Sequence, residues 1–396
     1  MVQHTMTQPH KNTCPAFFLD ATIDPAGSYS PCTALGGGTF KFSNRSFKST
    51  WQDPKLADAR LRSIAGEKLD MCRRCWSEEE LGHTSERQHL LQDLPIGMDY
   101  TNPDYYLSGP KHLNIKVSNI CNLRCRTCQS KDSYLYHIEG EYYEKTYKLH
   151  HTAYTLEKFK KHFTDSQLDE LFEFCNNLDR IELYGGEPFL DNQVPKYLLR
   201  LIDAGLASNI DLSVSTNATH ELSDTWRTIL TSFKNVIINV SIDAVGSQFT
   251  YMRHPGKWES VEKILSDFFT LEHNASNNNI TVQPVITVSA LNILSLPSVF
   301  DYFKQYNVKP FLILVQWPKY YCVNVLPESV RPEVEAVLMQ YDSAEFAPVI
   351  NLLNTPRYES WDKFKFWTQA KDDYREEDFV NTFPEMAHLL SKHNEW

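Results

Sequence analysis

The sequence predicts an α/β fold with a parallel sheet between residues 111 and 317. Six short runs with the apolar residues of strands alternate there with segments that repeat apolar residues every three or four positions. Strands that alternate with helices pair in parallel through right-handed crossovers. The expected strands are 113–118, 180–184, 210–215, 236–242, 280–288 and 310–316, and the expected helices are 163–177, 194–207, 222–233, 258–271 and 294–306.

The rest of the chain is expected to add smaller parts to this core. A length of 396 residues, 42% of them hydrophobic, predicts two or three domains. Turn formers around Pro95, Gly97 and Pro103 indicate a linker. Helical spacing over 332–341 and 384–393 indicates a helical tail. The expected parts are an N-terminal tail (1–13), a cysteine-rich domain (14–82), a linker (83–110), the α/β core (111–317) and a helical C-terminal extension (318–396).

The composition argues against several classes of protein. No apolar run is long enough to span a membrane, and residues 1–10 lack the apolar core of a signal peptide. We therefore expect a cytoplasmic protein, in which the nine cysteines are ligands and free thiols rather than disulfides. The net charge of −11 argues against a broad nucleic-acid interface.

Three cysteines follow the first expected strand of the core in a Cys-x3-Cys-x2-Cys spacing. Cys121, Cys125 and Cys128 are close enough in sequence for their thiolates to converge on one metal centre. Three ligands are one fewer than a fully ligated iron–sulfur cluster or a structural zinc needs. The pattern therefore predicts a metal centre with an open position, where an exogenous molecule can bind.

This spacing resembles that of the radical S-adenosylmethionine (radical SAM) enzymes. Their three cysteines hold a [4Fe–4S] cluster, and SAM chelates the fourth iron. The match departs from many members at Thr127, where they have an aromatic residue. The resemblance implies a partial barrel of six strands for the core, a bound SAM molecule, and an external electron donor such as a flavodoxin.

A Gly-Gly-Glu sequence follows the second expected strand. Gly185 and Gly186 would let a ligand approach the backbone closely, and Glu187 supplies a carboxylate that can accept from an ammonium group. Alone, such a sequence is more often an ordinary turn. In radical SAM enzymes this motif binds the amino group of the methionine part of SAM, and these three residues match it.

Polar residues also follow the third and fourth expected strands, where ligands of parallel sheets bind. The resemblance assigns Ser215 and Asn217 to the SAM pocket, with a polar turn as the alternative. Ser241 and Asp243 lie two residues apart and share one face of an extended chain, from which they can reach ribose hydroxyls. Arg253 matches an arginine that binds the SAM carboxylate in related enzymes, with a surface arginine as the alternative.

The N-terminal segment contains four further cysteines that could ligate one centre. A turn at 25–27 predicts a hairpin, and a helix is expected over 47–65, with Trp51, Leu56 and Leu61 as anchors. The four cysteines are Cys14, Cys32, Cys72 and Cys75. Their order resembles a twitch domain, the shortened relative of the SPASM domain, which implies an auxiliary [4Fe–4S] cluster. A tetrahedral zinc site is the alternative.

The remaining features are expected to be structural. Cys175 lies on the apolar stripe of an expected helix and is interpreted as a core residue. Cys322 follows the last expected strand, and contact with substrate or a cluster is the less favoured interpretation. The tyrosine-rich insertion at 134–154 is expected to be a solvated, partly helical excursion, although its aromatic residues could instead contact substrate.

Together these observations predict a radical SAM enzyme. It would cleave SAM reductively at the [4Fe–4S] cluster and use the resulting 5′-deoxyadenosyl radical to modify a substrate. Because twitch-containing relatives act largely on peptides and proteins, a peptide or protein side chain is the expected substrate. The alternatives are a radical SAM enzyme for a small molecule and a non-catalytic zinc-binding protein.

Overall fold

The computed structural model describes most of the chain, and its described residues form two compact units. The described residues are 10–35, 46–80, 84–94, 98–149, 160–275, 279–342, 344–357 and 359–396. Unit 1 comprises Met1–Ser118, Lys161–Val214 and Ser223–Val236, and unit 2 comprises Asn119–Lys160, Ser215–Leu222 and Ile237–Trp396.

An open, mostly parallel sheet confirms the predicted α/β class. Its strands follow the order β2-β1-β3-β4-β5-β6-β7-β8, and parallel registers join β3 to β4, β4 to β5 and β7 to β8. The six expected strands are present as β3 (His112–Lys116), β4 (Arg180–Tyr184), β5 (Asp211–Thr216), β6 (Asn235–Ser241), β7 (Ile280–Val288) and β8 (Phe311–Leu314).

The predicted N-terminal hairpin belongs to the same sheet. β1 (Asp20–Ile23) and β2 (Tyr29–Ser30) pair antiparallel around a turn in which Gly27 has a φ of 75°, a backbone conformation that suits glycine. β1 also pairs in parallel with β3, with Ala21 opposite Leu113. The sequence predicted the hairpin but not this pairing, because a four-residue strand does not reveal its neighbour.

The helix expected over 47–65 is two helices, α2 (Phe47–Trp51) and α3 (Pro54–Ile64). Pro54 cannot donate a backbone hydrogen bond, and it occupies the first turn of α3, where that donor is not needed. Asp53 caps α3 by accepting from the backbone N–H of Lys55 at 2.8 Å. Trp51 and Leu56 are buried as predicted, whereas Leu61 is 67% exposed, so its assignment as an anchor was wrong.

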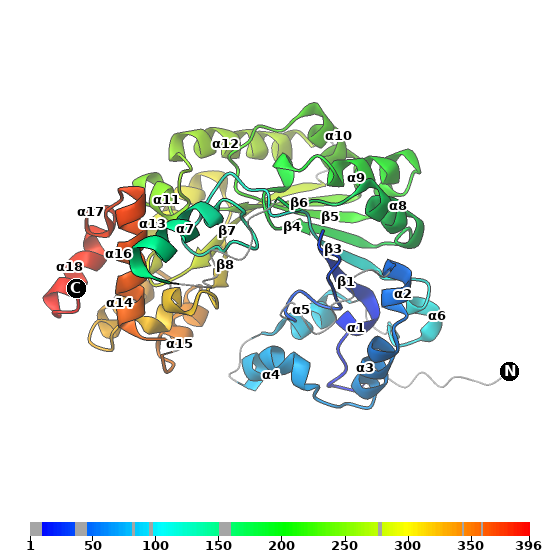
Figure 1. Cartoon of the computed structure of the whole chain (residues 1–396), viewed down its shortest axis with the longest axis horizontal. Helices are drawn as coiled ribbons and strands as arrows, with labels where there is room; N and C mark the ends of the chain where they lie inside the picture. The colour runs from blue at the N-terminus through cyan, green and yellow to red at the C-terminus, as the bar shows by residue number, and fades with distance from the viewer. Residues whose placement is uncertain are drawn as a thin grey trace. The chain divides into compact units, whose positions relative to one another are not determined.

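The other helices of unit 1 flank the sheet and the cysteine-rich segment. α8, α9 and α10 lie beside one another along the strands β3 to β5 (Figure 1) and confirm three expected helices. The elements are α1 (Ala16–Leu19), η1 (Asp70–Cys72), α4 (Arg73–Glu80), α5 (Glu86–Asp93), α6 (Pro103–Tyr106), α8 (Asp165–Phe174), η2 (Pro188–Leu190), α9 (Val194–Asp203), η3 (Ala207–Asn209) and α10 (Asp224–Ser232).

Unit 2 contains the remaining core helices and the C-terminal extension, which is helical as predicted. The elements are α7 (Tyr136–Tyr147), α11 (Gly246–Met252), α12 (Trp258–Asn274), η4 (Ile293–Ser295), α13 (Leu296–Phe303), η5 (Lys304–Tyr306), η6 (Lys319–Tyr321), η7 (Val323–Val325), α14 (Arg331–Asp342), α15 (Ala347–Leu353), α16 (Trp361–Arg375), α17 (Phe379–Thr382) and α18 (Pro384–Lys392).

The tyrosine-rich insertion is partly helical, as predicted, but one side of its helix α7 is buried rather than solvated. Tyr136 and Tyr143 on α7 are fully buried and form a cluster with Ala370 of α16. The ring of Trp367 on α16 meets Tyr143 edge-on, with ring centroids 5.5 Å apart. The sequence did not reveal this packing because the two helices are more than two hundred residues apart.

Two cysteines outside the predicted metal sites are core residues. Cys175 caps the end of α8 and is buried, as predicted. Cys322 is fully buried, and its thiol donates to the backbone carbonyl of Val315 at 3.0 Å. Cys322 is therefore a packed residue at the start of η7.

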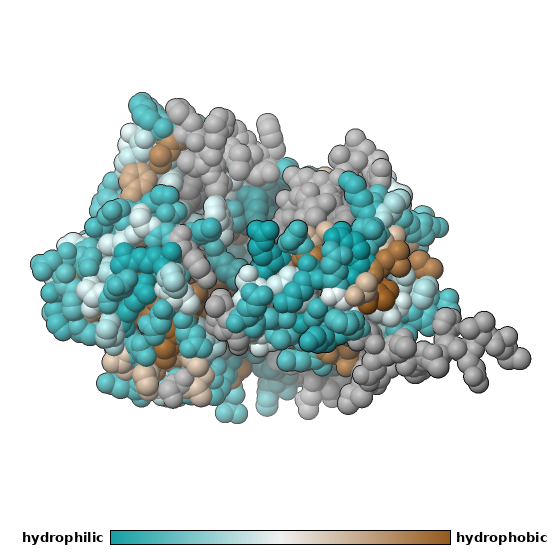
Figure 2. All heavy atoms as spheres, turned by 90° about the horizontal axis from the view of Figure 1, so that it is seen from below, coloured by the Kyte–Doolittle hydropathy of each residue, from teal (hydrophilic) through white to brown (hydrophobic). Residues whose placement is uncertain are grey.

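The face drawn in Figure 2 is mostly hydrophilic, with hydrophobic residues in small separate patches. This distribution is typical of a water-exposed surface. None of the helices in the described ranges has the length and apolar character needed to cross a membrane.

Candidate metal and cofactor site

The three cysteines of the Cys-x3-Cys-x2-Cys spacing lie in one loop of unit 2, near enough for Cys121 and Cys125 to act on Cys128 but not gathered as around a bound ion. Burial raises the pKa of the Cys128 thiol well above its usual range, and nearby Asp132, Cys125 and Cys121 raise it further. Burial also raises the pKa of Cys125. The thiolate forms of Cys121 and Cys125 would repel a thiolate at Cys128, and a bound cation would relieve this repulsion.

Hydrogen-bond donors surround the sulfur atoms of this cysteine loop, which we define as residues 121–128. The backbone N–H of Leu123 lies 3.4 Å from the Sγ of Cys121. The side-chain amide of Asn217 lies 3.7 Å from the same sulfur, and Nη1 of Arg253 lies 3.7 Å from the Sγ of Cys125. Such donors stabilise thiolates that ligate a metal cluster. This part of the chain therefore fits a cluster held by three cysteines.

Arg253 is paired with another predicted site residue. Its Nη2 lies 3.0 Å from Oδ2 of Asp243, and both side chains are buried. The other oxygen of Asp243 accepts from the backbone N–H of Thr287 at 2.9 Å. Nε of Arg253 is buried and has no hydrogen-bond partner among the described residues. The Nε edge of the guanidinium group can therefore donate to an anionic ligand while the ion pair with Asp243 stays intact.

The other two strand ends place their predicted residues as follows. Ser241 is the last residue of β6, and Ser215 lies in β5. Asn217 follows β5 and donates from Nδ2 to the side-chain oxygen of Asn122 at 3.1 Å. The left-handed residue of this turn is Ala218, with a φ of 53°, rather than Asn217. The turn thus directs the Asn217 amide to the cysteine loop.

The Gly-Gly-Glu sequence forms a tight turn at the end of β4 in unit 1. Gly185 and Gly186 have φ angles of 76° and 60°, which L-residues with a side chain rarely adopt. Glu187 is 1% exposed and caps η2 by accepting from the N–H of Phe189 at 3.2 Å. A Cβ on Gly185 would lie 2.5 Å from Cγ of Lys116. Both the backbone angle and the available space therefore require glycine at position 185.

We expect Gly185→Ala to weaken SAM binding about tenfold, because a left-handed alanine costs about 1–2 kcal/mol, and relief of this strain moves the turn. Isothermal titration of anaerobic protein with SAM measures the change. Gly205→Ala is the matched control, because Gly205 has a similar φ of 70° but has open space where its Cβ would lie. Equal SAM affinity in both variants would contradict a role of this turn in SAM binding.

The four N-terminal cysteines line one cavity of unit 1. Cys14, Cys32, Cys72 and Cys75 all contribute to its wall. Burial is the main cause that raises the pKa of Cys32 to about 12 and that of Cys72 to about 12. In the described ranges, no three potential ligands already meet as they would around a bound ion. The donor set fits a four-thiolate centre, and both a [4Fe–4S] cluster and tetrahedral Zn²⁺ use such a set.

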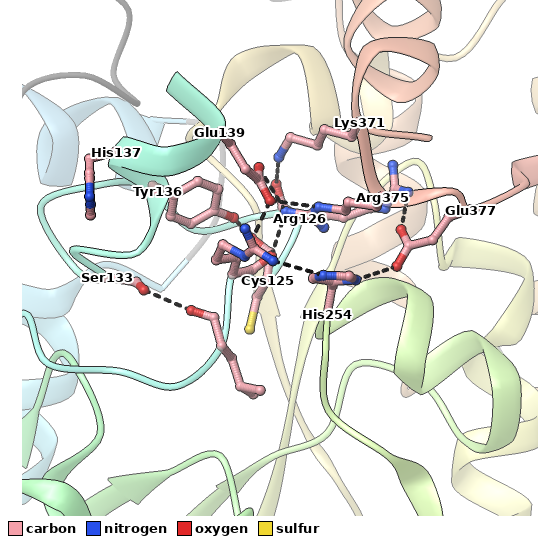
Figure 3. A network of polar contacts seen from close by, with 12 residues as sticks. Cys125, Arg126, Ser133, Tyr136, His137, Glu139, His254, Lys371, Arg375 and Glu377 are labelled. Atoms are coloured by element: carbon pink, nitrogen blue, oxygen red, sulfur yellow. Dashed lines mark hydrogen bonds and ion pairs between the residues drawn. The ribbon is translucent and has the colours of Figure 1, made fainter. Parts of the chain in front are cut away.

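A buried ionic network beside the cysteine loop was missed by the sequence analysis. Arg126 has a fully buried side chain and forms an ion pair with Asp372. It forms a second ion pair with Glu377 at 2.6 Å, and Figure 3 labels both of these residues. Arg375 and Glu139 form a second pair at 2.9 Å in which both side chains are fully buried. The sequence contained one indication of this network, because Arg124 and Arg126 lie between the cysteines. An arginine buried near a metal site needs a charged partner, so acidic residues could have been sought elsewhere in the chain.

His254 connects this network to the loop. It contacts Glu377 through Nδ1 at 2.7 Å and Arg124 through Nε2 at 3.0 Å. Burial opposes ionisation of Glu377, but His254, Arg126 and Arg375 outweigh it, so the pKa of Glu377 is lowered. The pKa of Glu139 is also lowered, because Arg375 and other nearby cations outweigh the effect of burial.

These lowered pKa values predict a loss of stability in acid. A carboxyl group whose pKa is lower in the folded state contributes stability above its unfolded value, here 4.5, and loses it as the pH falls through the folded value. The urea midpoint should therefore fall below about pH 4.5, and Glu377→Gln should show a shallower fall than the wild type. Exposed Glu376→Gln is the control, and an equal slope in both variants would contradict the prediction.

Residues 115–295 match the family model described as the Radical SAM superfamily. This stretch of the chain is similar to a radical SAM domain. The match begins in β3 and ends in η4, so it includes the cysteine loop, the Gly-Gly-Glu turn and Arg253. It does not reach the four N-terminal cysteines or the C-terminal helices that hold Lys371 and Arg375. No curated protein sequence matches the chain significantly.

Solved structures similar to this chain include two proteins at low identity. One is anSMEcpe with bound AdoMet and the Cp18Cys peptide, at 18% identity and a TM-score of 0.40, with 61% of this chain and 62% of that chain covered. Another is Streptococcus suis SuiB bound to the precursor peptide SuiA, at 14% identity and a TM-score of 0.36, with 80% and 64% covered. The chain thus spans less than two thirds of the length of each of these two structures.

Proposed function

We propose that the protein is a radical SAM enzyme whose cluster is held by Cys121, Cys125 and Cys128. The observation that carries this proposal is the donors at the cysteine sulfurs, with the Asn217 amide 3.7 Å from Sγ of Cys121 and the Arg253 guanidinium 3.7 Å from Sγ of Cys125. When bound, a [4Fe–4S] cluster and SAM supply the 5′-deoxyadenosyl radical that abstracts a hydrogen atom from substrate. The chain supplies binding and orientation.

We assign the parts of SAM to residues by their chemistry. Glu187, after the turn of Gly185 and Gly186, accepts from the amino group of the methionine part. Arg253 binds the SAM carboxylate through its unpartnered Nε edge, because a guanidinium group suits a carboxylate in this way. Ser241 and Asp243 bind the ribose hydroxyls of SAM, and Ser215 and Asn217 line the SAM pocket.

The N-terminal cysteines hold an auxiliary [4Fe–4S] cluster in this proposal. Support comes from the cavity that Cys14, Cys32, Cys72 and Cys75 share and from the similarity of their order to a twitch domain. A structural zinc is the alternative that the same donors permit. The two differ in metal content, with about eight irons per chain for two clusters and about four irons with one zinc otherwise.

The proposed substrate is a side chain of a peptide or protein. The twitch-like arrangement supports this choice, because such domains accompany radical SAM enzymes that modify peptides. Electrons come from an external donor such as a flavodoxin. The proposed location is the cytoplasm, since reducing compartments keep thiols available as metal ligands.

Formation of 5′-deoxyadenosine tests the proposed activity. Anaerobically reconstituted protein, given dithionite and SAM, should produce 5′-deoxyadenosine that mass spectrometry detects. Addition of a substrate peptide should increase the yield. The proposal fails if the wild-type protein forms no more 5′-deoxyadenosine than the Cys125→Ala variant.

A further inference from the structure

Four consecutive carbonyl groups of the cysteine loop, from Leu123 to Arg126, each accept a hydrogen bond from a side chain. No helix or strand includes this loop, although the carbonyl of Cys125 also accepts from the backbone N–H of Cys128 at 2.9 Å. A carbonyl buried without a partner would cost free energy. The side chains that satisfy these carbonyls therefore decide how the peptide planes between the cysteines are oriented.

The C-terminal helix α16 provides two of these donors. Nη2 of Arg375 donates to the carbonyl of Arg124 at 2.7 Å, and Nζ of Lys371 donates to the carbonyl of Arg126 at 3.0 Å. Lys371 and Arg375 are four residues apart on α16 and so project from one face of the helix. Figure 3 shows both side chains directed to the loop from this helix.

The segment that enters and begins α7 provides the other two donors. The hydroxyl of Ser133 donates to the carbonyl of Leu123 at 2.7 Å, and the hydroxyl of Tyr136 donates to the carbonyl of Cys125 (Figure 3). Tyr136 is fully buried. Along the loop, donors from the segment that leads into α7 and begins it therefore alternate with donors from α16.

The amide groups of the same loop are held as well. The N–H of Arg124 donates to the carbonyl of His254 at 2.7 Å, and the N–H of Arg126 donates to the carbonyl of Met252 at 2.8 Å. The peptide unit after Cys125 is therefore held at both its C=O and its N–H group, and the unit before Cys125 is held at its C=O group. A peptide plane that is fixed in this way also fixes the direction of the Cα–Cβ bond of the cysteine.

We propose that Lys371, Arg375 and Tyr136 are positioning residues that orient Cys125 and Cys128 for the cluster. The proposal deepens the proposed function, because it assigns to the helical C-terminal extension the task of shaping the cluster-binding loop. These residues do not touch the cluster or SAM in this account. They act through the loop backbone, which connects residues 371–375 to a motif about 250 positions earlier in the chain.

The burial of Lys371 supports a role in orientation rather than in stability. Burial, followed by the nearby Arg375, lowers the pKa of Lys371 well below its usual range. A buried ionisable group is a weak source of stability, because desolvation offsets the attraction to its partners. Lys371 instead provides a hydrogen-bond donor of fixed geometry for the carbonyl of Arg126.

Cysteine labelling in the full-length protein without its clusters tests the proposal. The rate at which a maleimide modifies each cysteine is measured by mass spectrometry in wild type, Tyr136→Phe and Lys371→Met. We expect faster labelling at Cys125 and Cys128 by roughly twofold to tenfold, the range that one intramolecular hydrogen bond contributes. The matched controls are Tyr147→Phe on α7 and Lys363→Met on α16, both of which leave the loop carbonyls untouched.

Three outcomes are distinguishable. Faster labelling confined to Cys125 and Cys128 supports positioning. Rates equal to those of the controls overturn the proposal, as does a uniform increase at all nine cysteines, which would report general loosening. In the reconstituted protein, the electron paramagnetic resonance line shape of the reduced cluster should change in Tyr136→Phe and not in Tyr147→Phe. The labelling needs no SAM cleavage, so its result is independent of the test of the proposed function.

Discussion

Cys125→Ala is expected to remove about four irons per chain and to abolish SAM cleavage. A [4Fe–4S] cluster that loses one of three protein ligands keeps too few to be retained. Cys125 is the middle one of the three proposed ligands, and its sulfur lies 3.7 Å from Nη1 of Arg253. Iron and sulfide analysis of anaerobically reconstituted protein measures the loss, and the four irons assigned to the N-terminal cysteines should remain.

Cys175→Ala is the matched control for this variant. Cys175 is a buried thiol of unit 1 that packs beside α8, so its replacement tests for nonspecific effects of removing a cysteine. Its iron content should equal that of the wild type. Cys72→Ala should give the converse result, with the auxiliary iron lost and the SAM-binding cluster retained. An equal loss of iron in Cys175→Ala and Cys125→Ala would contradict the assignment of ligands.

Arg126→Met is expected to lower the free energy of unfolding by about 3–5 kcal/mol, because it leaves buried carboxylates without their cation. The guanidinium group is fully buried, lies 3.4 Å from the ring centre of Tyr251, and pairs with Asp372 and Glu377. Urea unfolding followed by circular dichroism measures the change. The reconstituted variant should also contain less iron, since Arg126 lies in the cysteine loop between the proposed ligands Cys125 and Cys128.

A double variant separates the ion pair from simple packing. Adding Asp372→Asn to Arg126→Met removes one of the unpaired charges, so part of the lost stability should return. Replacement of the exposed Arg357 by methionine is the control and should change stability by less than about 0.5 kcal/mol. If Arg126→Met is as stable as this control, the buried network does not hold the loop.

Local signals allowed the core to be predicted from the sequence. The expected strands coincide with β4 and β7 residue by residue, because short apolar runs between turn signals are properties of contiguous residues. The turn at Gly185 was equally local, since its glycines are adjacent. The break before Pro54 could have been anticipated from the backbone restrictions of proline alone.

Long-range packing could not be predicted in this way. The burial of Arg126 depends on Asp372 and Glu377, which follow it by about 250 residues. The sequence around Tyr136 predicts an exposed residue of a polar insertion, whereas packing against α16 buries it. Arginine, lysine and tyrosine are usually exposed or half-exposed, so the residues that hold the cysteine loop belong to types that a sequence pattern assigns to the surface.

The response of the reduced cluster to SAM decides whether the three cysteines of the loop hold a SAM-binding cluster. Electron paramagnetic resonance spectra of the anaerobic, dithionite-reduced protein are recorded with and without SAM. We expect the wild-type protein to give an iron–sulfur signal whose position shifts on addition of SAM. We expect no such shift in Cys125→Ala. A protein that retains zinc and no iron, or a signal that SAM leaves unchanged, would contradict the claim that Cys121, Cys125 and Cys128 hold a SAM-binding cluster.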